Sequence, residues 1–434
     1  MWYTMIEQKN PIHRQWMNHA IKSVLFALFS AMFLFVHDVE AQNGTSSPLS
    51  RFGIGEIETR DFGRTVGMGN VGIGYQSENF LNRRNPAGLS GIDTLRFILD
   101  VSAAMKFSEF LTGTQSQRAN NFGFKNLAIG VRLSKRWTSS VGLGPYSNVG
   151  YHIKVPTNRT STDDDQEVDF SGKGGVNKFY WANAFELFRG FSLGVTSSYI
   201  FGNITHNEEV DVMSIKETYS VNKMYFDFGA QYSHWFGQFT NVTLGGIYGY
   251  KSEMAIQRTQ TITGNTGTDR NQRRPDLKSY VPESYGAGFS ILRNKKNTEW
   301  VLAADYQFRN WAVDDSRLKS ITNSDSRMYS VGLQLTPNTK QPEKYIHAIR
   351  FQIGAIYNQT NLKVNGYQME DYSLSLGVGL PIVSRQQQTL SYVNISAIVG
   401  ESGTGQRGGI SERYFLLSVN LSLIERWFAK YLWY

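Results

Sequence analysis

Residues of the types that usually carry catalysis are sparse in this sequence. It contains seven histidines and no cysteine, and it lacks an H-E-x-x-H zinc-binding pair. Disulfides, thiolate catalysis and cysteine zinc sites are therefore excluded. An acyl-transfer pair of His152 with Ser192 or Ser198 stays open, because sequence does not fix the distance between them. Isolated histidines at strand ends are more typical of a membrane interface, so we expect no enzyme, no metal site and no cofactor.

Two short segments could bind a ligand by their residue types alone. Residues 67–72 read G-M-G-N-V-G, which matches the dinucleotide-binding fingerprint. That loop needs a preceding strand and a following helix, and the sequence predicts neither, so the glycines more simply permit tight turns. The acidic triplet Asp163–Asp165 lacks the ligand spacing of a calcium loop and predicts a solvated loop.

Composition excludes disorder and argues against nucleic acid as a partner. Aromatic residues make up 14% of the chain and charged residues 18%, the reverse of a disordered composition. The net charge is +8, but the basic residues are scattered singly rather than gathered into a patch. No linker divides the chain, which predicts one large architecture.

The N-terminus predicts export. Basic residues precede the uncharged run Ser23–Val36, and Val39 and Ala41 lie at the −3 and −1 positions of a cleavage site. We expect residues 1–41 to be a signal peptide that starts at Met1, Met5 or Met17. The run is shorter than the roughly 20 residues of a spanning helix, and an uncleaved anchor is the alternative.

From residue 96 onward, apolar and polar residues alternate with the period of a β-strand that has two different faces. The alternating segments have about ten residues or more, as tilted strands that cross a bilayer require, whereas globular strands have about five or six. The polar faces are rich in Gly, Ser, Asn and Gln, and aromatic residues gather at the segment ends. About fourteen such segments predict an all-β fold, a transmembrane antiparallel barrel.

The segment before the alternation has a different character. Residues 42–93 are rich in glycine and turns, and we expect them to form a hatch inside a barrel of residues 94–434. The polar stretches 156–168 and 263–278 predict extracellular loops, and residues 136–139 and 189–190 predict periplasmic turns.

Three features together resemble the FadL/TodX family of outer-membrane transporters for hydrophobic compounds, in its divergent Bacteroidota form. They are residues 50–55 (S-R-F-G-I-G), the motif Asn85-Pro86-Ala87-Gly88 before the first barrel strand, and a closing strand that ends in residues 425–428 (E-R-W-F). The resemblance implies a fourteen-stranded barrel with an N-terminal hatch, an extracellular ligand site and a lateral opening in the wall. It carries over only Asn85, Pro86, Ala87 and Gly88, as hatch structure.

A set of charged residues on the polar phase forms a candidate site inside the barrel. Both signs are mixed, so we expect ion pairs within the set and with the hatch. A carboxylate-binding fork at Arg132 or Arg350 is the alternative. The set comprises Arg96, Asp100, Lys106, Arg132, Glu186, Asp227, Asp305, Arg309 and Arg350.

Two functions stay open. A transporter for a hydrophobic or amphipathic molecule, such as a fatty acid, predicts an apolar pocket between hatch and wall. A non-transporting barrel subunit of an outer-membrane assembly or secretion complex predicts a plugged interior and a lipid-facing patch that binds another barrel. A passive porin is the third possibility, and a hatch argues against it. The expected partners are membrane lipid and lipopolysaccharide, with either a hydrophobic small molecule or other envelope proteins.

Overall fold

The computed structural model describes residues 46–426, with gaps at residues 95, 114, 157–166, 212, 265–268, 312–320, 339–344, 383–390 and 406–408. Three predictions lie outside the described residues: the signal peptide at residues 1–41, the acidic triplet Asp163–Asp165, and the closing aromatic pair Trp427 and Phe428. No helix in the described ranges is long and apolar enough to cross a membrane.

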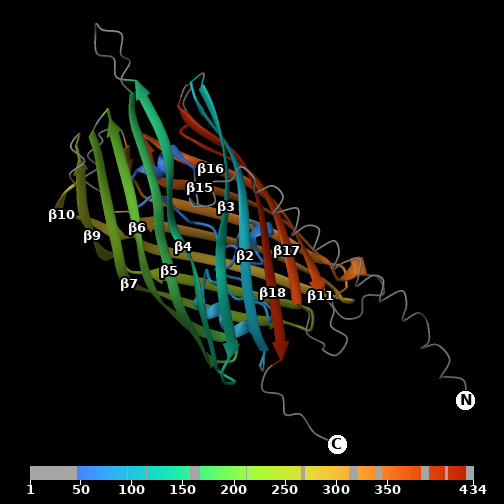
Figure 1. Ribbon diagram of the computed structural model, residues 1–434. Helices are drawn as coiled ribbons and strands as arrows, with labels where there is room; N and C mark the ends of the chain where they lie inside the picture. The colour runs from blue at the N-terminus through green and yellow to red at the C-terminus, as the bar shows by residue number, and fades with distance from the viewer. Residues whose placement is uncertain are drawn as a thin grey trace, which may run out of the picture. The chain divides into compact units, whose positions relative to one another are not determined.

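The barrel wall is built from long antiparallel strands (Figure 1). They are β2 (Arg96–Thr112), β3 (Gln115–Arg132), β4 (Trp137–Pro156), β5 (Glu167–Phe188), β6 (Phe191–Val210), β7 (Met213–Phe236), β8 (Thr240–Gly249), β9 (Ser252–Thr263), β10 (Asp269–Val281), β11 (Glu283–Lys295), β12 (Thr298–Asn310), β13 (Ile321–Asn323), β14 (Ser326–Thr336), β15 (Arg350–Val364), β16 (Tyr367–Ile382), β17 (Ser391–Gly403) and β18 (Ile410–Arg426).

The wall closes on itself because the last strand pairs with the first. β18 pairs with β2 along Arg96–Thr112. Three pairs of elements each form one wall strand with a short break. β8 and β9 both pair with β7, and β13 and β14 both pair with β15. β10 and β11 form the third pair, because they pair with β9 and β8. Fourteen strands therefore cross the described wall, and the predicted all-β transmembrane barrel is confirmed.

Alternation along each strand separates an apolar outer face from a polar inner face. In β12, Val301 and Asp305 are buried inside, whereas Leu302 and Tyr306 are each 37% exposed on the outer face. This is the arrangement of a barrel whose outer surface meets lipid. We call the end where β2 begins and β18 finishes the base, and the opposite end the mouth.

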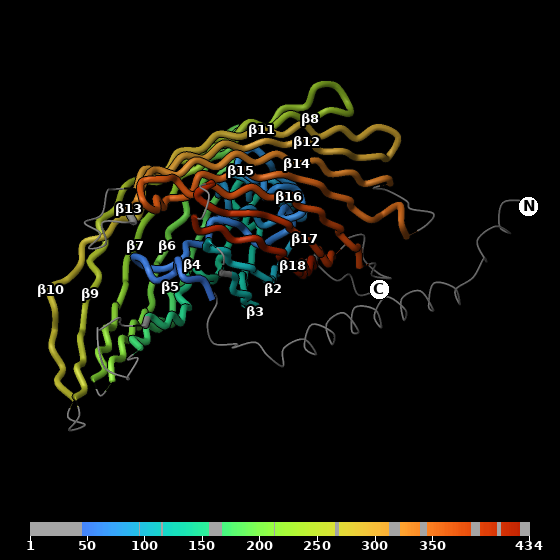
Figure 2. The backbone as a smooth tube through the Cα atoms, turned by 90° about the horizontal axis from the view of Figure 1, so that it is seen from above, coloured from blue at the N-terminus to red at the C-terminus, as the bar shows by residue number. Residues whose placement is uncertain are grey.

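One predicted loop is wrong. Most of residues 263–278 are strand, because β10 pairs with β9 from Asp269 to Val281. Both faces of β10 are largely exposed at the mouth, where β10 lies next to β9 and β9 in turn pairs with β7 (Figure 2). A strand with solvent on both faces does not alternate, so periodicity missed it. The turn at Arg189–Gly190 is confirmed, whereas the turn between β3 and β4 lies at residues 133–136.

The segment before β2 crosses the interior of the ring of strands (Figure 2). It holds three short 3₁₀ turns, η2 (Pro48–Arg51), η3 (Val66–Met68) and η4 (Pro86–Gly91), and a short strand, β1 (Glu56–Ile57). Its apolar side chains, such as Met68, Val71 and Ile73, have no exposed surface. We call described residues 46–91 the hatch.

Candidate functional site

The hatch touches the wall backbone to backbone at a series of wall glycines. A Cβ on any of these wall glycines would come within 3.0 Å of hatch backbone, a separation that real side chains essentially never show. Close approach of two chains is what glycine uniquely permits. The segment that matches the dinucleotide fingerprint is thus part of this contact. The pairs are Gly67 with Gly377, Gly69 with Gly354, and Gly74 with Gly288.

The side chain of Asp305 in β12 binds the backbone of the hatch. Its carboxylate accepts hydrogen bonds from the N–H groups of Gly72 at 2.6 Å, Ile73 at 2.8 Å and Gly74 at 3.4 Å. Successive N–H groups that converge in this way form an anion-binding nest. The Arg84 guanidinium lies 3.9 Å away. Burial lowers the pKa of Arg84, and the charge of Asp305 opposes that shift.

The predicted hatch motif, Asn85-Pro86-Ala87-Gly88, starts η4 and is fully buried. The Asn85 side chain accepts a hydrogen bond from Ala87 N–H at 3.0 Å, which caps the turn. The same side chain donates to the carbonyls of Ile73 at 2.8 Å in the hatch and Ala230 at 3.1 Å in β7. The motif therefore joins two hatch segments to the wall.

Two of the predicted interior charges hold the hatch at the base. Arg132 donates to the carbonyl of Ser90 in the hatch at 3.0 Å and pairs with Glu186 at 3.2 Å. Arg96 pairs with Glu78 of the hatch at 3.2 Å. With these partners, Arg132 has no free fork for a substrate carboxylate.

The other predicted charges separate into paired and unpaired groups. Lys106 pairs with Glu412 at 2.7 Å and lies 3.5 Å from Glu56 of β1. Arg350 is 3% exposed and stacks 3.6 Å from the centre of the Tyr392 ring. Among the described residues, Arg350 has no carboxylate within ion-pair distance. In the part of the chain that the structure describes, Asp100, Asp227 and Arg309 likewise have no oppositely charged group within ion-pair distance.

β3 and β4 pair only near the base. The resemblance implied a lateral opening in the wall, but the sequence did not locate it. Their ladder joins residues 127–132 of β3 to 138–143 of β4 and stops there. At this level β3 has a bulge at Lys125, and β4 reaches Pro145, which has no N–H to donate. Toward the mouth the two strands diverge (Figure 1), and β1 pairs with β4 on the side that β3 leaves free. We call this divergence the seam.

A cavity of about 730 Å³ lies between the hatch and the mouth half of the wall, and we call it the vestibule. Its lining carries ion pairs between hatch and wall, with Arg60 2.8 Å from Asp371 and Lys125 2.7 Å from Glu58. Apolar side chains such as Tyr151 and Phe170 line one side. The cavity is therefore of mixed polarity, unlike the continuous apolar pocket expected of a transporter.

A mainly apolar concavity lies on the outer face of the wall. A groove of about 1330 Å³ crosses that face from β8 to β3. Its floor includes Leu374, which is 68% exposed, and Val399, which is 61% exposed. We call this concavity the outer groove.

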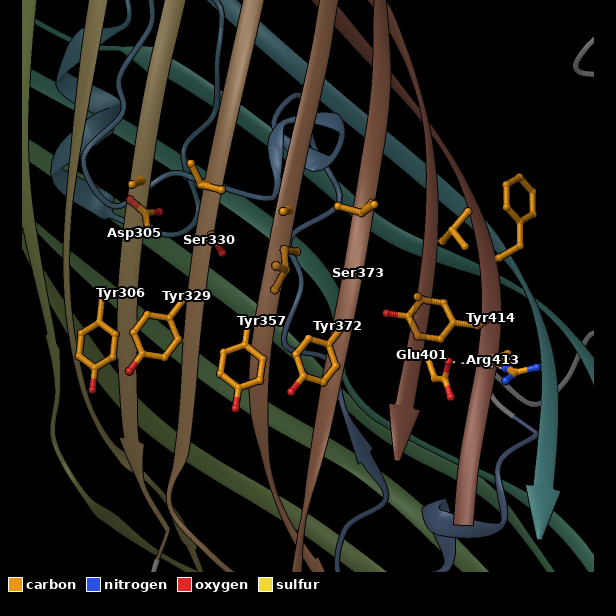
Figure 3. Close-up of a pocket in the computed structure, with 18 of the residues that line it drawn as sticks. Asp305, Tyr306, Tyr329, Ser330, Tyr357, Tyr372, Ser373, Glu401, Arg413 and Tyr414 are labelled. Carbon is orange, nitrogen blue, oxygen red and sulfur yellow. Dashed lines mark ion pairs between the residues drawn. The ribbon is translucent and has the colours of Figure 1, made fainter. Parts of the chain in front are cut away.

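A row of tyrosines borders the outer groove on its mouth side (Figure 3). Tyr306, Tyr329, Tyr357 and Tyr372 come from adjacent strands, and their hydroxyl groups point toward the mouth. Their neighbouring rings lie 5.0, 5.9 and 4.9 Å apart. Glu370 accepts hydrogen bonds from the hydroxyls of Tyr357 at 2.9 Å and Tyr372 at 2.6 Å. Such a row is typical of a membrane interface.

The acyl-transfer pair that sequence left open does not form. Residues 190–194 fit the G-x-S-x-G pattern of a hydrolase nucleophile, yet Ser192 is 2% exposed and donates to the Ala87 carbonyl at 3.1 Å. His152 instead bonds Asp169 at 2.7 Å on the mouth half of the wall. Among the described residues no cluster could hold a metal ion.

A closed barrel with an internal hatch and an apolar outer face defines a membrane β-barrel protein of the FadL type. A sequence model of the BamG family matches residues 20–433, and the chain belongs to that family. Comparison with curated proteins gave no significant match.

Solved structures of the same fold are transporters and channels. The toluene transporter TodX of Pseudomonas putida has a TM-score of 0.57 at 13% identity, over 86% of this chain and 100% of its own. A FadL homologue of Pseudomonas aeruginosa gives 0.54 at 12% identity, over 86% and 99%. The monoaromatic hydrocarbon channel CymD gives 0.50 at 14% identity, over 86% and 98%. At these identities the likeness is one of fold.

Proposed function

We propose that this protein is a membrane-embedded subunit of a larger assembly in the bacterial outer membrane and that it conducts no substrate. The observation that carries the proposal is the location of the apolar surface. The outer groove is mainly apolar, whereas the interior holds a hatch that lies directly on wall glycines and a vestibule of mixed polarity.

The interior argues against passage. A route between the hatch and this side of the wall has to separate the backbones of Gly69 and Gly354 or remove Asp305 from its three N–H donors. Charge-assisted hydrogen bonds of that kind each contribute about 1.5–3 kcal/mol. The vestibule above the hatch is crossed by ion pairs, so an apolar molecule would gain little by entering it.

The exterior fits a protein partner within the bilayer. The outer groove lies on the base side of the tyrosine row, which places it at the depth of the hydrocarbon core. Structures that span a membrane are helices or closed barrels, and the convex wall of a second β-barrel fits a concavity of this kind. We therefore assign the outer groove to another integral outer-membrane barrel. The base then faces the periplasm and the mouth faces lipopolysaccharide and the outside, and no catalytic role is proposed.

The experiment is to extract the tagged, full-length protein from its native envelope with mild detergent and to isolate the assembly. We expect one integral barrel partner at constant stoichiometry, retained by the Leu193→Arg variant and lost from the Leu374→Arg variant. Leu193 is a lipid-facing residue of β6 outside the outer groove, so it controls for the charge itself. A partner retained equally by both variants, or no partner at all, would contradict the proposal.

Transport of a hydrophobic small molecule is the second candidate. Two observations favour it: the fold is that of TodX and CymD, and the seam adjoins the vestibule. Uptake of labelled toluene or oleate by cells that carry or lack the protein tests it. Uptake that depends on the protein, and that survives the Leu374→Arg change, would favour transport over the subunit role.

A further inference from the structure

One edge of the wall lacks a neighbouring strand. β3 pairs with β2 from Gln115 to Val131, but it pairs with β4 only over residues 127–132. Within the described residues, segment 115–125 of β3 therefore has no strand on its second side. At about 3.3 Å per residue, the free edge is roughly 35 Å long.

The hatch covers the facing edge of β4 and leaves that of β3. Glu56 and Ile57 of β1 pair with Asn148 and Ser147 of β4. Further along β4, the Ser50 hydroxyl donates to the Gly150 carbonyl and accepts from its N–H, both at 3.0 Å. The hatch reaches β3 through a side chain, with Glu58 against Lys125.

The free edge is continuous in register with the tyrosine row. Register places Tyr372 opposite Glu401. It continues from Glu401 through Arg413 and Glu109 to Arg118 of β3. The hydrogen-bonded ladder therefore connects Arg118 to the tyrosine row across the outer face of the wall.

Residues 119–125 follow Arg118 toward the base, and among them Phe124 is 47% exposed on the outer face. An open strand edge is not stable against hydrocarbon, because its N–H and C=O groups find no partner there.

We propose that an extended segment of the partner protein pairs with residues 115–125 of β3 and so adds a strand to the wall at the seam. The proposal rests on the subunit role above and names how the partner is bound. Backbone groups along a whole edge are satisfied by another strand, the mode known as β-augmentation. The edge is also continuous with the outer groove, since Arg118 and Asn120 line the end of that groove. One partner can thus contact both.

Hydrogen exchange measures this directly. The isolated barrel in lipid nanodiscs and the native assembly are exchanged in parallel, and peptides from β3 are followed by mass spectrometry. We expect amides in residues 115–125 to exchange at least tenfold more slowly in the assembly. Residues 127–132, which pair with β4 in either case, serve as the internal control. Equal exchange of residues 115–125 in both samples would overturn the proposal.

Two proline variants test the same edge. Neighbouring N–H groups on a strand point to opposite sides, so of Ala119→Pro and Asn120→Pro one removes a donor to β2 and the other removes a donor from the free edge. We expect the edge variant to fold as a heat-modifiable barrel and to lose the partner, while the controls Ala119→Ser and Asn120→Ser keep it. If both folded proline variants retain the partner, the proposal fails.

The outcomes separate the two proposals. An assembly that depends on the outer groove but leaves β3 unprotected would overturn strand addition and leave the subunit role in place. Absence of any assembly would overturn both.

Discussion

The carboxylate of Asp305 accepts a 2.6 Å hydrogen bond from the backbone N–H of Gly72, which is 233 positions earlier in the chain. The contact fixes the centre of the hatch to β12 of the wall, and two further N–H donors converge on the same side chain. The hatch is thereby held through its backbone N–H groups. This mode of attachment does not depend on the identity of most hatch side chains.

Replacement of Asp305 by Asn is expected to loosen the hatch while the wall persists. The amide keeps one acceptor oxygen but loses the charge that the nest of N–H groups stabilises, a change of about 1.5–3 kcal/mol. Trypsin should then cut after Arg83 or Arg84, which the wild type holds near Asp61 and Asp305 inside the barrel. Asp276→Asn, on the exposed face of β10, is the control and should leave digestion unchanged. Equal resistance of both variants would show that the nest does not hold the hatch.

Gly354→Ala is expected to destabilise the barrel, because the added methyl group would overlap the backbone of Gly69. Overpacking of this kind costs about 1–3 kcal/mol. The thermal midpoint of the heat-modifiable band should fall relative to the wild type. Gly264→Ala is the matched control, since no atom lies within 4 Å of its added methyl group. A Gly354→Ala midpoint equal to that of Gly264→Ala would contradict direct backbone contact.

Leu374→Arg is expected to weaken partner binding more than it weakens the barrel. A cation on the lipid face costs up to about 2–4 kcal/mol at the bilayer midplane, and Leu193→Arg carries a comparable cost. The two variants should therefore unfold at similar denaturant concentrations, while only the first releases the partner in a pull-down at equal expression. Similar pull-down yields would remove the outer groove from the interface.

Removal of residues 46–91 is expected to convert a barrel that does not conduct ions into an ion-conducting pore. In planar bilayers the full chain should show no steady conductance, because the hatch occupies the interior on the wall glycines. The deletion should conduct ions if the wall folds without the hatch, and its β-sheet signal in circular dichroism checks that it does. Steady conductance by the full chain would contradict a sealed interior.

Periodicity predicted the barrel because each wall strand places lipid on one side and a polar interior on the other. It missed β10, where both faces meet solvent, and it could not detect the seam. A bulge at Lys125 and a proline at Pro145 matter only because the two strands that hold them lie opposite each other, and pairing is not encoded in either segment alone. The glycines of the six-residue segment 67–72 are visible in the sequence, but the wall glycines that Gly67 and Gly69 contact lie in β16 and β15. Asp305 was identified as an inward charge, whereas its backbone partners were not.

The backbone contacts between hatch and wall also constrain the order of assembly. The hatch is synthesised before the strands that enclose it, and it touches wall strands from β4 to β16. A segment held this closely by glycines on several sides cannot be threaded into a ring that has already closed. The final pairing of β18 with β2 must therefore take place around a hatch already in position, so that the hatch serves as a template for closure of the wall.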